Sequence, residues 1–177
     1  KHWADNDNQD GKRPRWITVQ LYADKTPIGS SVNIFNSDNW THTWTDLDAN
    51  LNYDVVETGR QNPKDNVYEV TYDDSIPGNI LLTNTYVPKT TEISGTKTWD
   101  DNNNQDGKRP IEIQVNLLAN NNKVESKKVT EKENWKYVFT NLPKYSNGKE
   151  IEYSISENKV EDYTSKIEGT NIINSYT

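Results

Sequence analysis

The sequence predicts an all-β protein built from two β-sandwich domains in tandem. Three observations carry this prediction. Short segments alternate apolar and polar side chains with the period of a half-buried strand, turn residues recur between them at short spacing, and the first half of the chain is repeated in the second half. The sequence has no apolar stripe with helical spacing long enough for a core helix, so we expect helical structure only as a short turn inside a loop.

The repeat gives the domain organisation. Residues 1–14 read KHWADNDNQDGKRP and residues 97–110 read KTWDDNNNQDGKRP, so eleven of fourteen positions are identical. Looser matches continue to the ends of both copies, and a polar segment around Pro88 separates them. We therefore predict one domain over residues 1–88, called module one, and a second over residues 89–177, called module two.

The strands are expected in the same order in both modules. The first ends in Lys-x-Trp, the second alternates apolar and polar side chains, the third is rich in aromatic residues, the fourth ends in Glu, and the last contains Asn-x-Tyr. In module two these segments are 93–99, 113–117, 135–139, 153–157 and 174–176; in module one they are 1–3, 17–21, 40–44, 53–57 and 84–86.

Turns are predicted at four Gly-containing pairs, namely Asp10-Gly11, Pro77-Gly78, Asp106-Gly107 and Asn147-Gly148. Module one has no counterpart of residues 93–96, so its first strand is expected to fray.

Composition and charge exclude several classes of protein. Only 31% of the 177 residues are hydrophobic, yet 6 Trp and 10 Tyr can build small aromatic cores. The absence of Cys excludes disulfides and thiolate metal sites, and with only His2 and His42 we expect no metal and no cofactor. The formal charge of −7 argues against a nucleic-acid partner, and no apolar run is long enough for a membrane span. A polar, Cys-free composition rich in Asn and Thr is typical of an extracellular bacterial β-protein.

The charge is divided unequally between the two modules. Module one has 7 basic and 13 acidic side chains, whereas module two has 13 basic and 14 acidic ones. The repeats therefore share a scaffold but not a surface, which favours a common structural role over an identical binding site in both modules.

Three polar residues in each module are predicted on the apolar face of their strands. Successive side chains of a strand point to opposite faces, so Lys97, for example, shares its face with Ile93 and Trp99. The three are a Lys on the first strand, a Glu in the middle of the module and an Asn on the last strand: Lys1, Glu57 and Asn84 in module one, and Lys97, Glu157 and Asn174 in module two.

This trio has the parts for a covalent crosslink. Burial shifts the pKa of a Lys and of a Glu toward their neutral forms. A neutral amine is a nucleophile, and a protonated carboxyl polarises an amide carbonyl and shuttles protons, so the amine can attack the Asn Cγ with loss of ammonia. The product is a Lys–Asn isopeptide bond between the first and last strands. The alternative is a Lys that extends to solvent, a Glu that pairs with it and an Asn that caps a turn; the recurrence of all three in both modules favours the crosslink.

The motifs resemble those of CnaB-type domains, the B-type repeats of collagen adhesins among Gram-positive surface proteins. The resemblance rests on Lys-x-Trp-x-Asp, Asn-Gln-Asp-Gly-Lys-Arg-Pro, Tyr-x-(Val/Ile)-x-Glu and Asn-x-Tyr, and it covers both modules. It implies an inverse immunoglobulin-like (prealbumin-like) β-sandwich in each module. Carried over by position, it also implies isopeptide bonds catalysed by Glu in two sets: Lys1 to Asn84 with Glu57, and Lys97 to Asn174 with Glu157.

The resemblance further implies a structural function. The modules would be stalk or spacer repeats of a cell-wall-anchored adhesin at the extracellular bacterial surface, resistant to force and to proteolysis. Their partners would be neighbouring repeats of the same chain, with host extracellular matrix bound through other domains; we expect a monomer, no nucleic acid and no membrane insertion. The crosslink forms once per molecule, so the protein is not expected to be an enzyme.

Other sites are less well supported by the sequence. The motif Asn6-x-Asn8-x-Asp10-Gly11 and its copy resemble the start of a calcium loop, but Ile17 and Ile113 stand where a bidentate Glu is required, so plain turns are expected. The Lys-Arg-Pro segments at 12–14 and 108–110 are interpreted as solvated turns.

Trp16 supports an alternative function. It aligns with Glu112 and falls between inward positions, so an exposed ring could bind a glycan or a host matrix protein; packing against the neighbouring module or a loop is the competing interpretation. A glycosidase would need an open cleft with paired carboxylates, and the inward Glu is better explained by the crosslink.

Overall fold

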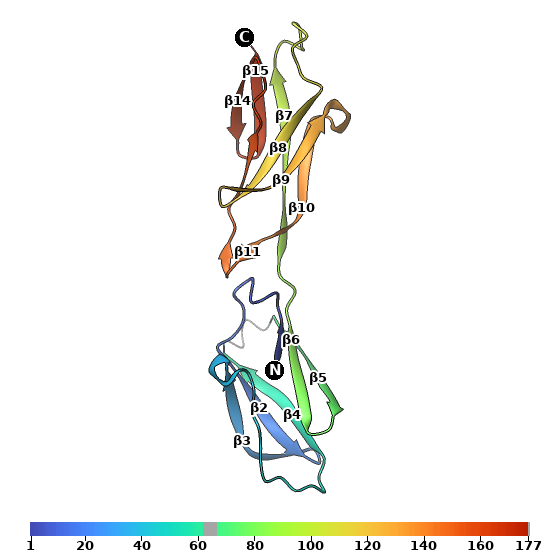
Figure 1. Ribbon diagram of the computed structural model, residues 1–177, viewed down its shortest axis with the longest axis vertical. Coiled ribbons are helices and arrows are strands. Elements are labelled where there is room, and N and C mark those ends of the chain that lie inside the picture. The colour runs from blue at the N-terminus through green and yellow to red at the C-terminus, as the bar shows by residue number, and fades with distance from the viewer. Residues whose placement is uncertain (62–66, 177) are drawn as a thin grey trace. The chain divides into compact units, whose positions relative to one another are not determined.

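The computed structural model describes residues 1–61 and 67–176, which form two compact units, Lys1–Pro88 and Lys89–Thr177 (Figure 1). Nearly all of the regular structure is β, which confirms the predicted all-β class. Short 3-10 turns at Asn36–Asp38 and Glu131–Glu133 are the helical segments of the described residues.

Module two is a sandwich of two sheets. One sheet has the order β10-β7-β15-β14 and the other β13-β8-β9, while β11 and β12 form a small hairpin. The strands are β7 (Thr90–Asp100), β8 (Glu112–Ala119), β9 (Asn122–Thr130), β10 (Lys136–Pro143), β11 (Tyr145–Ser146), β12 (Lys149–Glu150), β13 (Tyr153–Glu157), β14 (Tyr163–Glu168) and β15 (Asn171–Tyr176).

Module one repeats this plan with fewer strands. Its sheets have the orders β1-β6-β5 and β3-β2-β4. The strands are β1 (His2–Ala4), β2 (Trp16–Ala23), β3 (Thr26–Phe35), β4 (Tyr53–Arg60), β5 (Glu69–Ile76) and β6 (Asn79–Thr85).

Each core lies between the two sheets of its module. The alternation predicted for the second strand is confirmed, because Ile17, Val19 and Leu21 of β2 are buried while the residues between them are half-exposed. In module two both sheets contribute to one apolar cluster, which contains Ile113, Val115, Leu117, Val129, Tyr137, Phe139, Leu142, Ile155 and Ile172.

The prediction of a strand at residues 40–44 of module one is wrong. Its counterpart β10 exists and pairs with residues 90–96 of β7. Among the described residues no strand pairs with residues 41–45, so their backbone is not held in regular structure. One hydrogen bond of this strand pairing is present in module one, because the backbone nitrogen of Lys1 donates to the Trp40 carbonyl. The backbone nitrogen of Lys97 donates to the Trp135 carbonyl in the same way in module two. The first strand, β1, is short, with 3 residues over His2–Ala4.

The first and last strands of each module are parallel neighbours. In module two, Lys97 lies opposite Ile172 and Trp99 lies opposite Asn174 in the β7–β15 ladder. In module one, Trp3 lies opposite Asn84 between β1 and β6. The Lys and the Asn therefore lie on adjacent strands, offset by two residues, a distance of about 6–7 Å along the strand that a Lys side chain can span.

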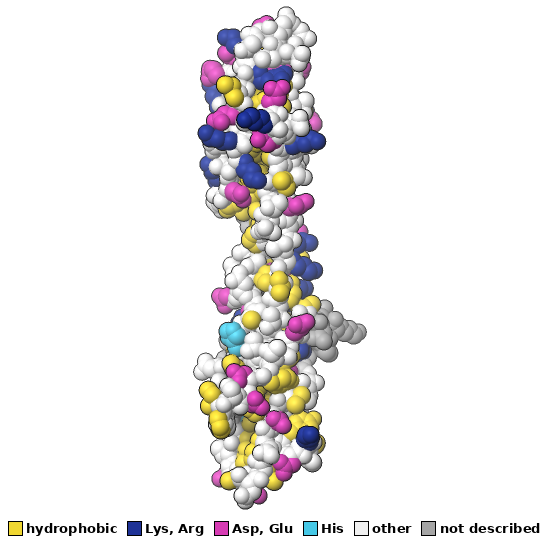
Figure 2. Space-filling view, turned by 90° about the vertical axis from the view of Figure 1, so that its right-hand side faces the viewer, with side chains coloured by type: hydrophobic (Ala, Val, Ile, Leu, Met, Phe, Trp, Pro, Cys, Tyr) yellow, Lys and Arg dark blue, Asp and Glu magenta, His cyan; other side chains and the backbone are white. Residues whose placement is uncertain are grey.

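The two modules differ in surface charge. On the face drawn in Figure 2, Lys and Arg side chains are spread over module two, whereas few lie over most of module one. This distribution follows the unequal count of basic residues in the sequence. In the described part of the chain no helix has the length and apolar character required to cross a membrane.

Candidate functional site

The three predicted residues of module two meet inside the sandwich. The Glu157 carboxyl contacts the Lys97 amine through Oε2, and its Oε1 accepts a hydrogen bond of 2.8 Å from Asn174 Nδ2. The side chains of Lys97 and Glu157 are 0% and 1% exposed, and Asn174 is fully buried. Asn174 Oδ1 is buried with no hydrogen-bond partner among the described residues.

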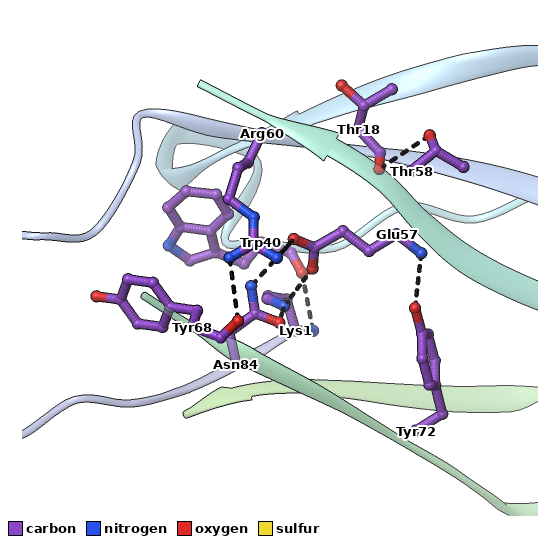
Figure 3. A network of polar contacts seen from close by, with 9 residues as sticks. All are labelled: Lys1, Thr18, Trp40, Glu57, Thr58, Arg60, Tyr68, Tyr72 and Asn84. Carbon is purple, nitrogen blue, oxygen red and sulfur yellow. Dashed lines mark hydrogen bonds and ion pairs between the residues drawn. The ribbon is translucent and has the colours of Figure 1, made fainter. Parts of the chain in front are cut away.

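Module one also brings its own three predicted residues together, with one additional contact between the Lys and the Asn (Figure 3). Lys1 Nζ lies 2.8 Å from Glu57 Oε2 and contacts the carboxamide oxygen of Asn84. Asn84 Nδ2 donates to Glu57 Oε1 at 3.1 Å. The side chains of Lys1 and Glu57 are 2% and 1% exposed, so this ion pair lies in the core and not at the surface.

Strand alternation explains how these side chains reach the core. On β4, Val55 and Glu57 point inward while Asp54 and Val56 are exposed. Leu51 has the same parity as Val55 and Glu57 in the sequence, but it precedes the strand and is exposed. The polar trio is thus held by the same alternation that buries the apolar residues.

Burial changes the chemistry of the two amines. Desolvation lowers the pKa of both Lys1 and Lys97, although the hydrogen bond and charge of the neighbouring Glu act in the opposite direction. Each amine also lies over a Trp ring, at 4.9 Å from the centroid of Trp3 for Lys1 and 4.3 Å from that of Trp99 for Lys97. An amine, a carboxyl and a carboxamide in contact inside a dry core have the groups required for acyl transfer.

A second buried cluster was missed by the sequence analysis. In module two, Arg109 forms a two-point contact with Asp101, with Nε to Oδ2 at 2.9 Å and Nη2 to Oδ1 at 2.6 Å. The Tyr163 hydroxyl donates to Oδ2 at 2.9 Å, and the Asn104 backbone donates to Oδ1 at 3.0 Å. Arg109 also lies over Trp99, with its Cζ 5.4 Å from the ring centroid.

Module one has the same cluster, formed by Asp5, Arg13 and Tyr68 with the Asn8 backbone. The interpretation of the Lys-Arg-Pro segments as solvated turns is therefore wrong for the Arg, because its guanidinium binds a buried carboxylate. The available signal was the Asp-to-Arg spacing of eight residues, which is identical in both repeats. The Tyr could not be found this way because Tyr68 and Tyr163 lie 63 and 62 residues beyond the Asp in the sequence.

The Asp–Arg cluster organises the loop that resembles a calcium site. Asn6, Asp7 and Asn8 have left-handed backbone conformations, as do Asn102, Asn103 and Asn104. Asn and Asp tolerate this conformation better than other non-glycine residues. Among residues 1–61 and 67–176 no group of three or more His, Asp or Glu side chains could hold a metal ion.

Trp16 has a packing partner within its own module. It lies half-buried on β2, with its ring centroid 5.9 Å from that of Phe35 at the end of β3. This contact within the module favours packing over a binding role for Trp16.

Acid should destabilise module two through Asp101. The hydrogen bonds from Arg109, reinforced by those of Asn104 and Tyr163, hold the pKa of this carboxyl well below its usual value near 3.9. Because the folded-state pKa is the lower one, the contribution of Asp101 to the free energy of unfolding is complete above the unfolded-state pKa and is lost as the pH falls through the folded-state pKa. Urea denaturation between about pH 6 and pH 2 should show this decline. An Asp101→Asn variant should show a shallower decline, and an equal decline in both proteins would contradict the assignment.

Comparisons with known proteins identify the family. The profile of the Cna protein B-type domain matches residues 1–85 and 93–175. A curated relative, a collagen adhesin of Staphylococcus aureus, is 51% identical over 178 residues, which cover 100% of this chain and 15% of that protein.

Solved structures agree with this match. The crystal structure of two B repeat units (B1B2) of the collagen binding protein of Staphylococcus aureus superposes with a TM-score of 0.92 at 49% identity, covering 99% of this chain and 47% of that one. This likeness confirms the predicted tandem of immunoglobulin-like, prealbumin-like β-sandwiches. The chain belongs to the Cna protein B-type domain family and contains two tandem repeats of that domain.

Proposed function

We propose that each module forms an intramolecular isopeptide bond between its Lys and its Asn, catalysed by its Glu. The tandem modules then serve as a stalk or spacer of a cell-wall-anchored surface adhesin, where the bonds give resistance to force and to proteases. The observation that carries the proposal is the same in both modules: one buried carboxyl contacts the Lys amine with one oxygen and the Asn carboxamide with the other.

The reaction balances with the groups at the site. A proton first passes from the Lys ammonium to the Glu carboxylate, which leaves a neutral amine and a protonated carboxyl. The Lys nitrogen adds to the Asn Cγ, and the carboxyl carries a proton from that nitrogen to the carboxamide nitrogen. The bond from Cγ to Nδ2 breaks, ammonia leaves, and the new amide joins the two strands. The Glu ends in its protonated form.

The buried trio favours the first step of this reaction. An ion pair inside a sandwich core loses its hydration, whereas the neutral amine and carboxyl do not carry that penalty. The lowered pKa of Lys1 and of Lys97 acts in the same direction. Asn174 Oδ1, which is buried without a donor, would gain one from a protonated Glu157 after rotation of the carboxamide.

A bond at this position would carry load efficiently. In module two the entering chain forms β7 and the leaving chain forms β15, and these strands are adjacent and parallel. Tension would pass from Lys97 to Asn174 through the covalent bond, so residues 98–173 would not be stretched. Closing a loop of this size would also stabilise the module by about 4–5 kcal/mol, by the chain-entropy argument used for disulfides.

The matched relative supports the proposed setting of the modules. Because that relative is a collagen adhesin, we place this chain at the extracellular bacterial surface, with neighbouring repeats as its partners. The chain spans 15% of that protein, so contact with host matrix is assigned to other parts of the parent adhesin. The crosslinking is a single event per molecule and not enzymatic turnover.

Intact-mass measurement tests the proposal. The full chain should be lighter than its sequence mass by two molecules of ammonia, one from each module. A Lys97→Arg variant should lose only one, since a guanidinium stays protonated and is not a nucleophile. The matched change at the exposed Lys123 should still lose two. A wild-type mass equal to the sequence mass would overturn the proposal.

A further inference from the structure

The two modules differ at one residue that faces the carboxyl of the trio. In module one Arg60 Nη2 lies 3.2 Å from Glu57 Oε1, and Arg60 Nη1 donates to the Tyr68 carbonyl at 3.4 Å (Figure 3). The position three residues after the Glu in module two is Val160, which packs against the apolar core. The carboxyl thus has a second cation beside it in module one and an apolar neighbour in module two.

We propose that Arg60, through its contact with the Glu57 carboxyl, opposes the proton transfer from Lys1 and thereby makes module one crosslink more slowly than module two. This inference rests on the proposed isopeptide reaction and concerns its rate. Arg60 acts through Glu57, so it is a positioning residue for that reaction and not a catalytic one.

The groups that face the two carboxyls support this difference. Around Glu57 lie Lys1 from β1, Arg60 from the end of β4 and Asn84 from β6, while the Tyr72 hydroxyl of β5 accepts from the Glu57 backbone N–H. The Glu57 carboxylate therefore faces two cations, Lys1 and Arg60.

Around Glu157 the described contacts include one cation, Lys97, together with Asn174. Tyr137 also interacts electrostatically with this carboxylate, but burial raises the pKa of Tyr137 to about 12, so its hydroxyl stays neutral. The carboxyl of module two therefore has a single charged neighbour.

Arg60 opposes the proton transfer that starts the reaction. The step converts an ammonium–carboxylate pair into a neutral pair, and a guanidinium in contact with the carboxylate is favourable only before the transfer. Arg60 also repels the Lys1 ammonium, which favours the neutral amine. Burial has the largest influence on the pKa of Lys1, however, and the charge of Arg60 has the smallest influence on that pKa. The direct contact of Arg60 with Glu57 therefore outweighs its effect on Lys1, and the net effect of Arg60 is to slow the reaction.

The rate can be measured separately for each module in the full chain. The protein is made by cell-free synthesis, samples are quenched with acid at intervals, and a protease digest is analysed by mass spectrometry for the Lys1–Asn84 and Lys97–Asn174 crosslinked peptides. Because the contact of Arg60 with the carboxylate is favourable only before the proton transfer, the module one product should form about tenfold more slowly.

Four variants separate charge from packing. Arg60→Met should accelerate module one about tenfold, whereas Arg60→Lys, which keeps the cation, should stay slow. Val160→Arg should slow module two by a similar factor, and this arm remains informative if an Arg60 variant folds poorly. Arg15→Met is the matched control, because Arg15 is exposed and has no contact with the Glu57 carboxyl among the described residues.

The outcomes are distinct. Equal rates in both modules together with no effect of Arg60→Met would overturn the role of Arg60 while leaving the crosslinking proposal intact. Slower crosslinking in Arg60→Met would also overturn it, since this result indicates that Arg60 only supports packing. If neither module loses ammonia in any variant, the proposed function fails and this inference fails with it.

Discussion

Replacing Glu157 with alanine is expected to abolish the crosslink of module two. The variant should lose one molecule of ammonia instead of two, because Lys97 and Asn174 remain but no group can move the proton between them. The free energy of unfolding of module two should fall by about 4–5 kcal/mol from the lost loop closure alone. For a module of about 90 residues this corresponds to a melting temperature lower by roughly 20–30 °C.

Calorimetry and intact-mass measurement on the same sample check this result. Glu157→Gln keeps the shape of the side chain but cannot accept the proton, so it should also prevent the crosslink. Glu152→Ala is the matched control, since Glu152 is an exposed Glu just ahead of the same strand. In module one Glu57→Ala should act in the same way, with the exposed Glu69→Ala as its control. A Glu157→Ala protein that still loses two molecules of ammonia would show that another group catalyses the reaction.

Replacing Asp101 with alanine is expected to destabilise module two by about 3 kcal/mol without affecting the crosslink. The change removes the acceptor of four hydrogen bonds and leaves the Arg109 guanidinium, the Tyr163 hydroxyl and the Asn104 backbone without it. The Arg109 side chain is 20% exposed, so water can solvate part of the orphaned charge and the loss falls at the lower end for a broken buried ion pair.

Denaturant unfolding and intact mass separate the two effects. Asp101→Ala should lower the denaturation midpoint and still lose two molecules of ammonia. The matched control is Asp100→Ala, because Asp100 is the exposed neighbour on β7. Unchanged stability in Asp101→Ala would show that the Asp–Arg cluster contributes nothing net, and a lost crosslink would show that it positions Lys97.

Much of the fold could be predicted from the sequence because its signals are local. Alternation in Ile113–Leu117 gives both the strand and the buried face of β8, and the Gly-containing turns give the hairpin ends at Pro77-Gly78 and Asn147-Gly148. Because the two modules repeat the same motifs, each of these signals occurs twice in the sequence. The trio was predictable for the same reason, since a Lys, a Glu and an Asn each fell on an apolar face in both copies.

The absence of a strand at Trp40 to Trp44 of module one could not be predicted in this way. The aromatic alternation of Trp40 to Trp44 is as regular as that of β10, yet the segment is not a strand. A strand needs a neighbour to satisfy its backbone hydrogen bonds, and no described strand pairs with residues 41–45, whereas β10 pairs with β7. Side-chain pattern carries no information about whether that neighbour is present.

The class of fold, the repeat and the three polar residues on the apolar faces could be read from the amino-acid sequence, because periodicity and repetition are properties of the chain alone. The groups that surround these residues are known only from the folded arrangement. Asp101 meets Tyr163 and Glu57 meets Arg60 through contacts whose distances depend on sheet register and side-chain rotamer. Arg109 and Arg60 look like ordinary surface residues in the sequence, since a charge is recognised as buried only when the elements packed over it are known.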